Sequence, residues 1–478
     1  MITVNHFING SYTAPSGGTY LDGFNPATGD VFSKIAHGDA ADVQKAVDAA
    51  CTALPAWKAM PAEDRFRILN AIAEGIEANL DELAAAESRD QGKPFWLSKT
   101  EMQRASQNFR FFATAAVQFA SESHQTDTRA INYTLRQPVG IVGCISPWNL
   151  PLYLFTWKIA PALAAGNCVV AKPSEFTPLT AYMLCEIANK AGLPPGVLNV
   201  VHGLGTTCGQ AIVEHPEIKA VSFTGGTATG KHIASVAAPM FKKLSLELGG
   251  KNPNIIFDDA DLNEAVKTSV RSSFLNQGEI CLCGSRVFVH TRVYDAFKTS
   301  LLQEVAKMQV GDLFDEKTRV GAIVSKPHFD KVLSYIDLAK QEGGHVLCGG
   351  HAVKPNGFEN GWYIAPTIIE GLDPNCRTNT EEIFGPVITL IPFETEEEVL
   401  AMANCTAYGL AATLWTTDLK RAHRMAEALQ SGIVWVNCWL LRDLRTPFGG
   451  VKQSGVGREG GWEAMRFFTE PKNVCIAY

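Results

Sequence analysis

The sequence predicts an α/β protein with two domains, each a parallel sheet wound with helices, and an additional small β element. Its 478 residues are too many for a single hydrophobic core. Strand-like apolar runs alternate with helical patterns twice along the chain, as they do in parallel α/β sheets. Two further strand-like segments, one before residue 139 and one at the C-terminus, belong to neither alternation.

The first alternation follows a helical N-terminal part. Leu69, Ile72, Ile76, Leu80 and Leu83 recur at steps of three and four, which predicts the buried stripe of an amphipathic helix. After it we expect strands at 139–145, 168–172, 197–201 and 220–224, with a helix over 179–191. Helices that separate consecutive strands indicate a parallel sheet.

The second alternation begins after Glu247, with strands expected at 254–257, 287–290, 411–415 and 433–436. The additional β element comes from two places. Polar residues 121–128 give way to alternating Ile131, Tyr133 and Leu135, which predicts one strand, and residues 473–478 predict another. Because an unpaired strand edge tends to associate, we expect the C-terminal strand to dock onto a neighbouring subunit.

The composition excludes several classes of protein. A formal net charge of −7 and the lack of a basic stripe argue against nucleic-acid binding. The most apolar stretch, 150–171, is interrupted by prolines, a lysine and a glycine, and the N-terminus lacks a basic region followed by an apolar run. We therefore expect neither a membrane span nor a signal peptide. The 12 cysteines are scattered and lack metal-ligand spacing, which predicts reduced thiols in the cytoplasm and no metal site.

Cys281 is the candidate nucleophile. It lies in Asn-Gln-Gly-Glu-Ile-Cys-Leu-Cys, just past a glycine-containing turn and before a strand-like run. A thiol attacks as the thiolate, so it needs backbone N–H groups or positive potential, and room that Gly278 and Gly284 would allow. The alternative is a small buried hydrophobe. Cys283 would point to the opposite side of an extended segment and take no part.

Two polar residues have the surroundings of catalytic groups. Asn149 lies between Pro147 and Pro151, which would hold its amide as an oxyanion donor worth about 3 kcal/mol in a transition state. The alternative is an ordinary turn asparagine. Glu247 is flanked by leucines, so desolvation would raise its pKa toward that of a general base. Here the alternative is a salt bridge at a domain boundary.

A nucleotide site is indicated where two strands end. Lys172 and Glu175 follow a strand at the sheet edge where open α/β folds bind nucleotides. A carboxylate there can accept both ribose hydroxyls and would repel the phosphate of NADP, which favours NAD. The alternative is a solvated Lys/Glu pair.

A set of glycines indicates where the phosphates of such a nucleotide would lie. Gly225, Gly226 and Gly230 link a strand to a helix, where bare N–H groups can face a pyrophosphate. A second set, at 203, 205 and 209, fits the usual glycine fingerprint slightly better, but a lone match is weak and we interpret it as a structural turn.

Taken together, these segments resemble the aldehyde dehydrogenase superfamily, in the family's order and over essentially the whole chain. The motifs are Ser-Pro-Trp-Asn (146–149), Lys-Pro-Ser-Glu (172–175), Phe-Thr-Gly-Gly-Thr (223–227), Leu-Glu-Leu-Gly-Gly-Lys (246–251), the run 276–281, Glu-Glu-Ile-Phe-Gly-Pro (381–386) and Pro-Phe-Gly-Gly (447–450). The resemblance implies two Rossmann-like domains. It assigns 1–117 and 138–246 to NAD binding, 247–446 to catalysis, and 118–137 and 464–478 to the strands of a dimer or tetramer.

The resemblance also implies residue roles. Cys281 would attack the aldehyde carbon, Asn149 and the Cys281 backbone N–H would hold the oxyanion, and Glu247 would activate water to hydrolyse the thioester. The residues implied to bind NAD are Trp148, Lys172, Glu175, Gly225, Gly226, Gly230, Glu382 and Phe384. Gly226 departs from the serine that many members have, which puts one hydrogen bond to phosphate in doubt.

A finer resemblance, carried by 276–283 and 437–443, is to the branch that acts on 2-hydroxymuconic and 2-aminomuconic semialdehydes. Arg442 and Arg104 stand where many relatives have aromatic or apolar pocket residues. Guanidinium groups bind carboxylates, so a small carboxylated aldehyde is implied, with Trp157 and Phe448 lining the walls. A surface position is the alternative for Arg104. Other carboxylated or aliphatic aldehydes, an acyl transfer to coenzyme A, and a non-catalytic binding or structural role are the competing functions.

Overall fold

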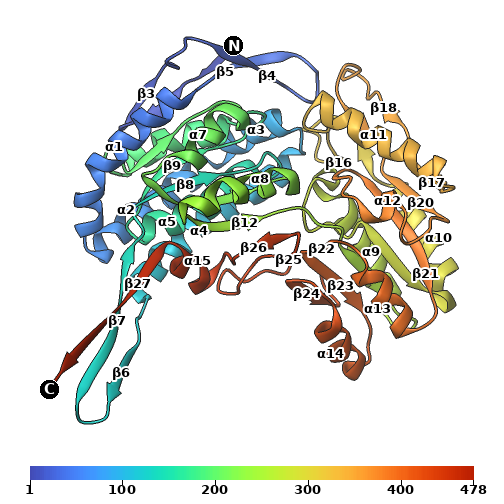
Figure 1. Cartoon of the computed structure of the whole chain (residues 1–478). Coiled ribbons are helices and arrows are strands. Elements are labelled where there is room, and N and C mark those ends of the chain that lie inside the picture. The colour runs from blue at the N-terminus through green and yellow to red at the C-terminus, as the bar shows by residue number, and fades with distance from the viewer.

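Two large sheets organise the chain, and a third, smaller sheet projects from the body as an arm (Figure 1). The computed structural model describes all residues from 1 to 478. Both large sheets are mainly parallel and carry helices on their faces, so the predicted fold class is confirmed.

The first sheet has the strand order β26-β12-β11-β8-β9-β10-β2-β3. Its strands are β26 (Gly455–Val456), β12 (Lys243–Glu247), β11 (Ile218–Thr224), β8 (Ile141–Ile145), β9 (Cys168–Lys172), β10 (Leu198–Val200), β2 (His6–Ile8) and β3 (Ser11–Thr13). The five strands from β12 to β10 are parallel, and the short strands at both edges are antiparallel. The chain runs from β8 outward to β10 and then returns to the other side of β8, so a topological switch point lies between β8 and β11.

Eight helices surround this sheet: α1 (Ala40–Ala59), α2 (Ala62–Ala78), α3 (Leu80–Gln91), α4 (Phe95–Gln118), α5 (Pro151–Ala164), α6 (Leu179–Lys190), α7 (Gln210–Glu214) and α8 (Thr227–Ala237). The predicted apolar stripe does not belong to one helix. It divides between α2 and α3 because Asn79, a weak helix former, leaves the helical conformation at φ −111° and ψ 23°. The apolar stretch that follows residue 150 is α5, in which every residue is buried.

The second sheet has the order β17-β20-β21-β14-β13-β23-β24. Its strands are β17 (His345–Cys348), β20 (Thr367–Glu370), β21 (Val387–Phe393), β14 (Arg286–His290), β13 (Pro253–Ile256), β23 (Ala411–Trp415) and β24 (Ile433–Val436). All but β17 are parallel. Its helices are α9 (Leu262–Phe274), α10 (Tyr294–Val305), α11 (Lys326–Gln341), α12 (Arg377–Thr380), α13 (Glu396–Asn404) and α14 (Leu419–Ala428).

The arm consists of β6 (Ser123–Thr126), β7 (Ala130–Pro138) and β27 (Thr469–Ala477), in the order β27-β7-β6. Both predicted strands of the β element are present, and they pair with each other in antiparallel register, with Ile131 opposite Ile476. The C-terminus lies at the tip of the arm (Figure 1). The outer edge of β27 remains without a partner strand in this chain.

The remaining elements are short. They are β1 (Ile2–Val4), β4 (Tyr20–Phe24), β5 (Val31–Ala36), β15 (Gln309–Val310), β16 (Thr318–Val320), β18 (Ala352–Val353), β19 (Tyr363–Ile364), β22 (Tyr408–Gly409), β25 (Val451–Lys452) and α15 (Gly461–Phe467), with one short π-helix, η1 (Gly205–Gly209), and the 3-10 helices η2 (Ala238–Met240), η3 (Leu275–Gly278) and η4 (Thr291–Val293). No helix combines the length and the apolar character needed to cross a membrane.

Candidate active site

Cys281 lies in the loop that joins α9 to β14, and the backbone before it is unusual. Asn276, Gln277 and Gly278 are three consecutive residues with left-handed φ angles of 52°, 55° and 72°. Non-glycine residues adopt this conformation at a cost, so the surrounding structure must hold them there. The Asn276 side chain does so by donating to the backbone oxygen of Asn149 at 3.0 Å. The nucleophile loop and the Asn149 turn are thereby fixed to each other.

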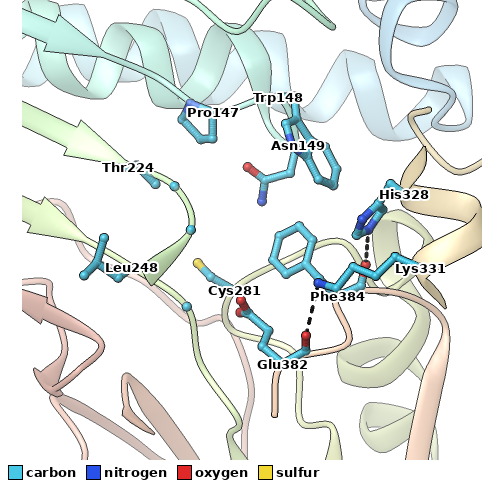
Figure 2. A pocket seen from close by; sticks show the side chains of 13 residues that line it. Pro147, Trp148, Asn149, Thr224, Leu248, Cys281, His328, Lys331, Glu382 and Phe384 are labelled. Carbon is cyan, nitrogen blue, oxygen red and sulfur yellow. Dashed lines mark hydrogen bonds between the residues drawn. The ribbon is translucent and has the colours of Figure 1, made fainter. Parts of the chain in front are cut away.

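Cys281 itself separates two cavities. One, of about 240 Å³, is lined by Trp148, Glu382 and Phe384 among others (Figure 2). The other, of about 40 Å³, contains Glu247 and lies on the substrate side of the loop. The backbone N–H of Cys281 donates to no group of the chain, so it is free to bind a developing oxyanion.

The Asn149 side chain is held firmly, as its two flanking prolines predict. Its Nδ2 donates to the backbone oxygen of Glu279 at 2.9 Å, and its own backbone oxygen accepts from Lys93 Nζ at 3.0 Å. The Asn149 amide and the Cys281 sulfur face the same cavity (Figure 2). The second N–H of the amide is therefore available beside the nucleophile.

Glu247 ends β12 with a buried carboxyl group, neither of whose oxygens has a hydrogen-bond partner. It forms no ion pair, so the alternative of a salt bridge at a domain boundary is wrong. Burial raises the pKa of Glu247 well above its usual range, and the carboxylate of Glu459 raises it further. Unsatisfied buried oxygens are rare in native proteins and indicate a place for water or substrate.

The sequence analysis missed Glu459 and Lys158, which lie beside Glu247. Lys158 Nζ donates to Glu459 Oε1 at 2.8 Å and to Ser222 Oγ at 3.1 Å, and all three side chains are buried. Glu459 lines the 40 Å³ cavity together with Glu247. The available signal was a lysine inside an apolar helix, because a buried lysine requires a carboxylate partner.

The electrostatics of Cys281 correct an expectation from the sequence. Burial raises the pKa of the Cys281 thiol, and the nearby carboxyl groups of Glu247 and Glu382 raise it further, with only Arg442 acting in the opposite direction. These surroundings therefore disfavour the thiolate, which is the form of Cys281 that attacks. Cys283 follows a turn rather than an extended segment, and burial raises the pKa of its thiol to about 12.

The larger cavity is lined by aromatic rings and by one partly buried carboxyl group. The rings of Trp148 and Phe384 meet edge to face, with their centres 5.3 Å apart. Glu382 Oε1 accepts a hydrogen bond from the Gly250 N–H at 2.8 Å. At Gly249 a Cβ atom would lie 2.4 Å from Glu382 Oε2, so only glycine leaves this carboxyl group in place. Burial raises the pKa of Glu382.

The remaining predicted cofactor residues lie at the carboxyl ends of β9 and β11. Lys172 Nζ is 3.0 Å from Glu175 Oε2, and the Lys172 side chain is buried, which does not fit a solvated pair. Gly225 and Gly226 line the larger cavity, and Gly226 precedes α8 without a side-chain cap, leaving the helix N–H groups bare. Gly230 does not line the cavity. It lies within α8, where a Cβ would come 2.4 Å from the Leu248 side chain.

The substrate side presents two guanidinium groups around one tyrosine, Tyr153, which the sequence analysis missed. Arg442 Nη1 donates to the Tyr153 hydroxyl at 2.7 Å, and its guanidinium lies 4.2 Å from the ring centre of Phe448. The Arg104 guanidinium lies 5.8 Å from the Tyr153 ring centre. Both arginines line the 40 Å³ cavity, as do Glu101, Glu247 and Glu459, but neither arginine forms an ion pair. The Trp157 ring centre lies 5.0 Å from the Arg442 guanidinium, and Trp157 does not line this cavity.

The site has a half-buried thiol with an aromatic cavity on one side and a carboxyl-lined cavity on the other, at the switch point of a parallel sheet. This combination is typical of a dinucleotide-dependent enzyme that attacks a carbonyl group. Comparisons with known proteins give the family. The aldehyde dehydrogenase family model matches residues 12–474. The chain belongs to the aldehyde dehydrogenase family and is an NAD-dependent aldehyde oxidoreductase.

Three similar proteins illustrate the relationship. The 2-aminomuconic semialdehyde dehydrogenase of Mus musculus is 48% identical over 100% of this chain and 99% of its own. The 2-hydroxymuconic semialdehyde dehydrogenase of Pseudomonas sp. (strain CF600) is 45% identical over 100% of both. The crystal structure of PnpE in complex with nicotinamide adenine dinucleotide has a TM-score of 0.97 and 42% identity, and covers 99% of this chain and 97% of that chain.

Proposed function

We propose that this enzyme oxidises a semialdehyde that carries a carboxylate, namely 2-hydroxymuconic or 2-aminomuconic semialdehyde, to the corresponding dicarboxylic acid. The observation that carries the proposal is the pair of unpaired guanidinium groups, Arg104 and Arg442, in the cavity beside Cys281. A partly buried guanidinium group without a carboxylate partner favours an anionic ligand. The names of the relatives at 48% and 45% identity support the same substrate class.

Cys281 attacks the aldehyde carbon while its thiol proton passes to solvent water, and the new carbon–sulfur bond gives a thiohemiacetal as its oxyanion. The oxyanion accepts hydrogen bonds from the Asn149 amide and the Cys281 backbone N–H, which are worth about 3 kcal/mol per donor. The residues proposed below to hold NAD would place a hydride acceptor beside this carbon, which is the chemistry needed to convert the thiohemiacetal to a thioester. Glu247 then takes a proton from water as the water oxygen attacks the thioester carbon, and the Cys281 thiolate leaves.

The residues proposed to hold NAD form two groups. Trp148, Glu382 and Phe384, in the cavity of about 240 Å³, would bind the nicotinamide and its ribose. The pyrophosphate would meet the bare N–H groups at Gly225 and Gly226, and Lys172 and Glu175 would bind the adenosine ribose. Gly230 would support this turn by letting α8 pack closely on Leu248.

Assembly and domain roles form part of the proposal. Residues 1–117 and 138–246 would bind NAD, 247–446 would carry catalysis, and the arm would join subunits into a dimer or tetramer. The exposed faces of the arm and the open edge of β27 support this role. A reducing location such as the cytoplasm is proposed because the cysteines, including Cys281, are free thiols.

A substrate panel with NAD tests the proposed specificity. It contains both muconic semialdehydes, a saturated dicarboxylic semialdehyde and neutral aliphatic aldehydes. Replacing Arg442→Met should lower kcat/KM for the acidic aldehydes by about 10–100-fold, since a charged hydrogen bond contributes about 1.5–3 kcal/mol. Neutral aldehydes should be affected far less. Steady-state NADH formation measures both.

The matched control is Arg445→Met, three residues along the chain, where the side chain is 81% exposed and pairs with Asp443. This control should leave the panel unchanged. If the wild-type enzyme turned over both muconic semialdehydes no better than aliphatic aldehydes, the proposed substrate would be wrong. Better turnover of the saturated semialdehyde would redirect the assignment to that substrate.

A further inference from the structure

A second, larger cavity opens beside the substrate cavity and is not used by the chemistry described so far. Its volume is about 500 Å³, and it shares Leu97, Arg104, Leu275 and Leu440 with the inner cavity of about 40 Å³. The inner cavity has room for only a few water molecules, at about 10–15 Å³ each. We call the cavity of about 500 Å³ the vestibule. Because these four residues line both cavities, the vestibule adjoins the inner cavity that contains Cys281.

The charge of the vestibule is opposite to that of the whole chain. Its walls carry five basic side chains and a single acidic one, Glu304. The basic residues are Arg104, Lys267, Arg271, Lys307 and Arg319. The chain as a whole has a formal net charge of −7, so this concentration of positive charge is local.

Three of these cations have no carboxylate partner. Lys307 pairs with Glu304 at 2.6 Å and Lys267 with Glu264 at 3.5 Å, whereas Arg104, Arg271 and Arg319 form no ion pair. Like Arg442 in the inner cavity, these three guanidinium groups can bind an anion without first breaking a salt bridge.

Aromatic rings hold two of the guanidinium groups in place. Arg271 lies 5.5 Å from the ring centre of Trp439 and donates to the Trp439 backbone oxygen at 2.8 Å. Arg319 lies 5.7 Å from the ring centre of Trp96. Trp439 in turn donates through Nε1 to the backbone oxygen of Leu282, next to the nucleophile. The vestibule wall and the nucleophile loop are therefore joined by one tryptophan.

We propose that the vestibule is an outer carboxylate-binding site, in which Arg271 and Arg319 capture the anionic substrate before Arg104 and Arg442 bind it in the inner cavity. This inference rests on the proposed function, because it requires an acidic aldehyde. A concave, basic surface concentrates an anion and raises its association rate by about 10–10³-fold, and salt screens the effect. The outer site therefore acts on kcat/KM and on its dependence on salt.

The test combines a double variant with a salt series. For the wild-type enzyme, kcat/KM for an acidic semialdehyde should fall at least about 10-fold between about 0.01 and about 1 M salt. In R271Q/R319Q the ratio of kcat/KM for acidic to neutral aldehydes should fall about 10-fold at low salt, and the salt dependence should flatten. The control R67Q/R292Q changes the same charge on surface arginines that are 74% and 77% exposed, outside the vestibule, and should behave as wild type.

Several outcomes would overturn the vestibule proposal. Equal losses for acidic and neutral aldehydes in R271Q/R319Q would show a structural role, and an unchanged salt dependence would place the attraction elsewhere. If the double variant did not fold, R319Q alone and the wild-type salt series would decide. A wild-type preference for acidic aldehydes without any salt dependence would reject the vestibule and leave the inner arginine pair intact. No preference at any salt concentration would reject the proposed function itself.

Discussion

Glu247 is a fully buried carboxyl group without a hydrogen-bond partner, and this isolation suits it to chemistry. A partner would fix its protonation state and occupy the oxygens that must receive a proton from water. The surrounding chain leaves space next to it by placing Gly449 there, where a Cβ would come 2.7 Å from Glu247 Oε1. An unsatisfied buried group reduces stability, which is the usual compromise at an active site.

Replacing Glu247→Gln should separate the two halves of the reaction. Glutamine cannot take a proton from water, so steady-state turnover should fall by about 10²–10⁴-fold. The first turnover should still release one equivalent of NADH per site and leave an acyl group on Cys281. Stopped-flow fluorescence measures the first quantity and mass spectrometry the second. Absence of both the burst and the acyl group would assign Glu247 to the first half-reaction.

The same variant has a predicted dependence on pH. Burial and Glu459 raise the folded-state pKa of Glu247, so wild-type turnover should increase with pH as the carboxylate forms. A carboxyl group with a raised folded pKa contributes stability below its unfolded pKa and loses that contribution as pH rises through the folded pKa. Glu247→Gln should therefore match the wild type in acid and be more stable in alkali, as measured by denaturant unfolding. A pH-independent difference would contradict a buried neutral carboxyl group.

At the residue scale, sequence reasoning found groups whose neighbours in the chain reveal them. Asn149 lies between prolines, and Glu247 lies between leucines before two glycines. It missed Tyr153, Lys158 and Glu459, because their importance comes from partners far away in the chain. Lys158 and Glu459, for example, are 301 residues apart. No local pattern contains such a pair.

At the scale of elements, the turn between α3 and α4 supports the active site through one buried lysine. Lys93 contacts Glu101 on α4, Glu87 on α3 at 3.6 Å, and the backbone oxygen of Asn149 at 3.0 Å, and its side chain is fully buried. Burial raises the pKa of Glu101, although Lys93 acts to lower it. One cation thus connects two helices to the turn that carries Asn149.

Replacing Lys93→Met should therefore cost both stability and activity. Removing one member of a buried ion pair typically destabilises a protein by about 3–5 kcal/mol, because the remaining charge is left without a partner. Denaturant unfolding measures this free energy, and kcat should also fall as Asn149 loses its support. The control is Lys99→Met on α4, where the lysine is 41% exposed and its partner Asp81 is 73% exposed. It should change stability by less than about 1 kcal/mol. Equal effects of the two substitutions would contradict the role of burial.

Sequence reasoning located the elements that are both buried and bounded by turn residues. The strands predicted at 168–172, 411–415 and 433–436 match β9, β23 and β24 residue for residue. It missed β21, an apolar run, and β26, a two-residue strand that exists only because it pairs with β12. Pairing of that kind is a property of the fold and leaves no mark on the local sequence.

At the scale of the whole molecule, the two sheets contribute different parts of one site. The first sheet brings Asn149, Glu247 and the glycines of α8 to the ends of adjacent strands, and the loop before β14 of the second sheet brings Cys281. The thiol thus lies where the two halves meet, with the cavity of about 240 Å³ on one side and the cavity of about 40 Å³ on the other.

The arm is the part of the molecule that its own chain does not explain. All four residues of β6 are exposed, and seven of the nine residues of β27 are exposed. A small sheet without a packed face is marginally stable in water, so a second copy of the chain should cover it. We expect the enzyme to be a dimer or tetramer by light scattering after size exclusion.

Ile476→Asp, at a position that is 50% exposed, should raise the dissociation concentration by at least about 10-fold, since burying such a side chain contributes about 1.5–3 kcal/mol. Leu419→Asp, at a 71% exposed position on α14, is the control and should not change the assembly. A monomeric wild-type enzyme, or equal shifts in both variants, would show that the arm does not hold subunits together.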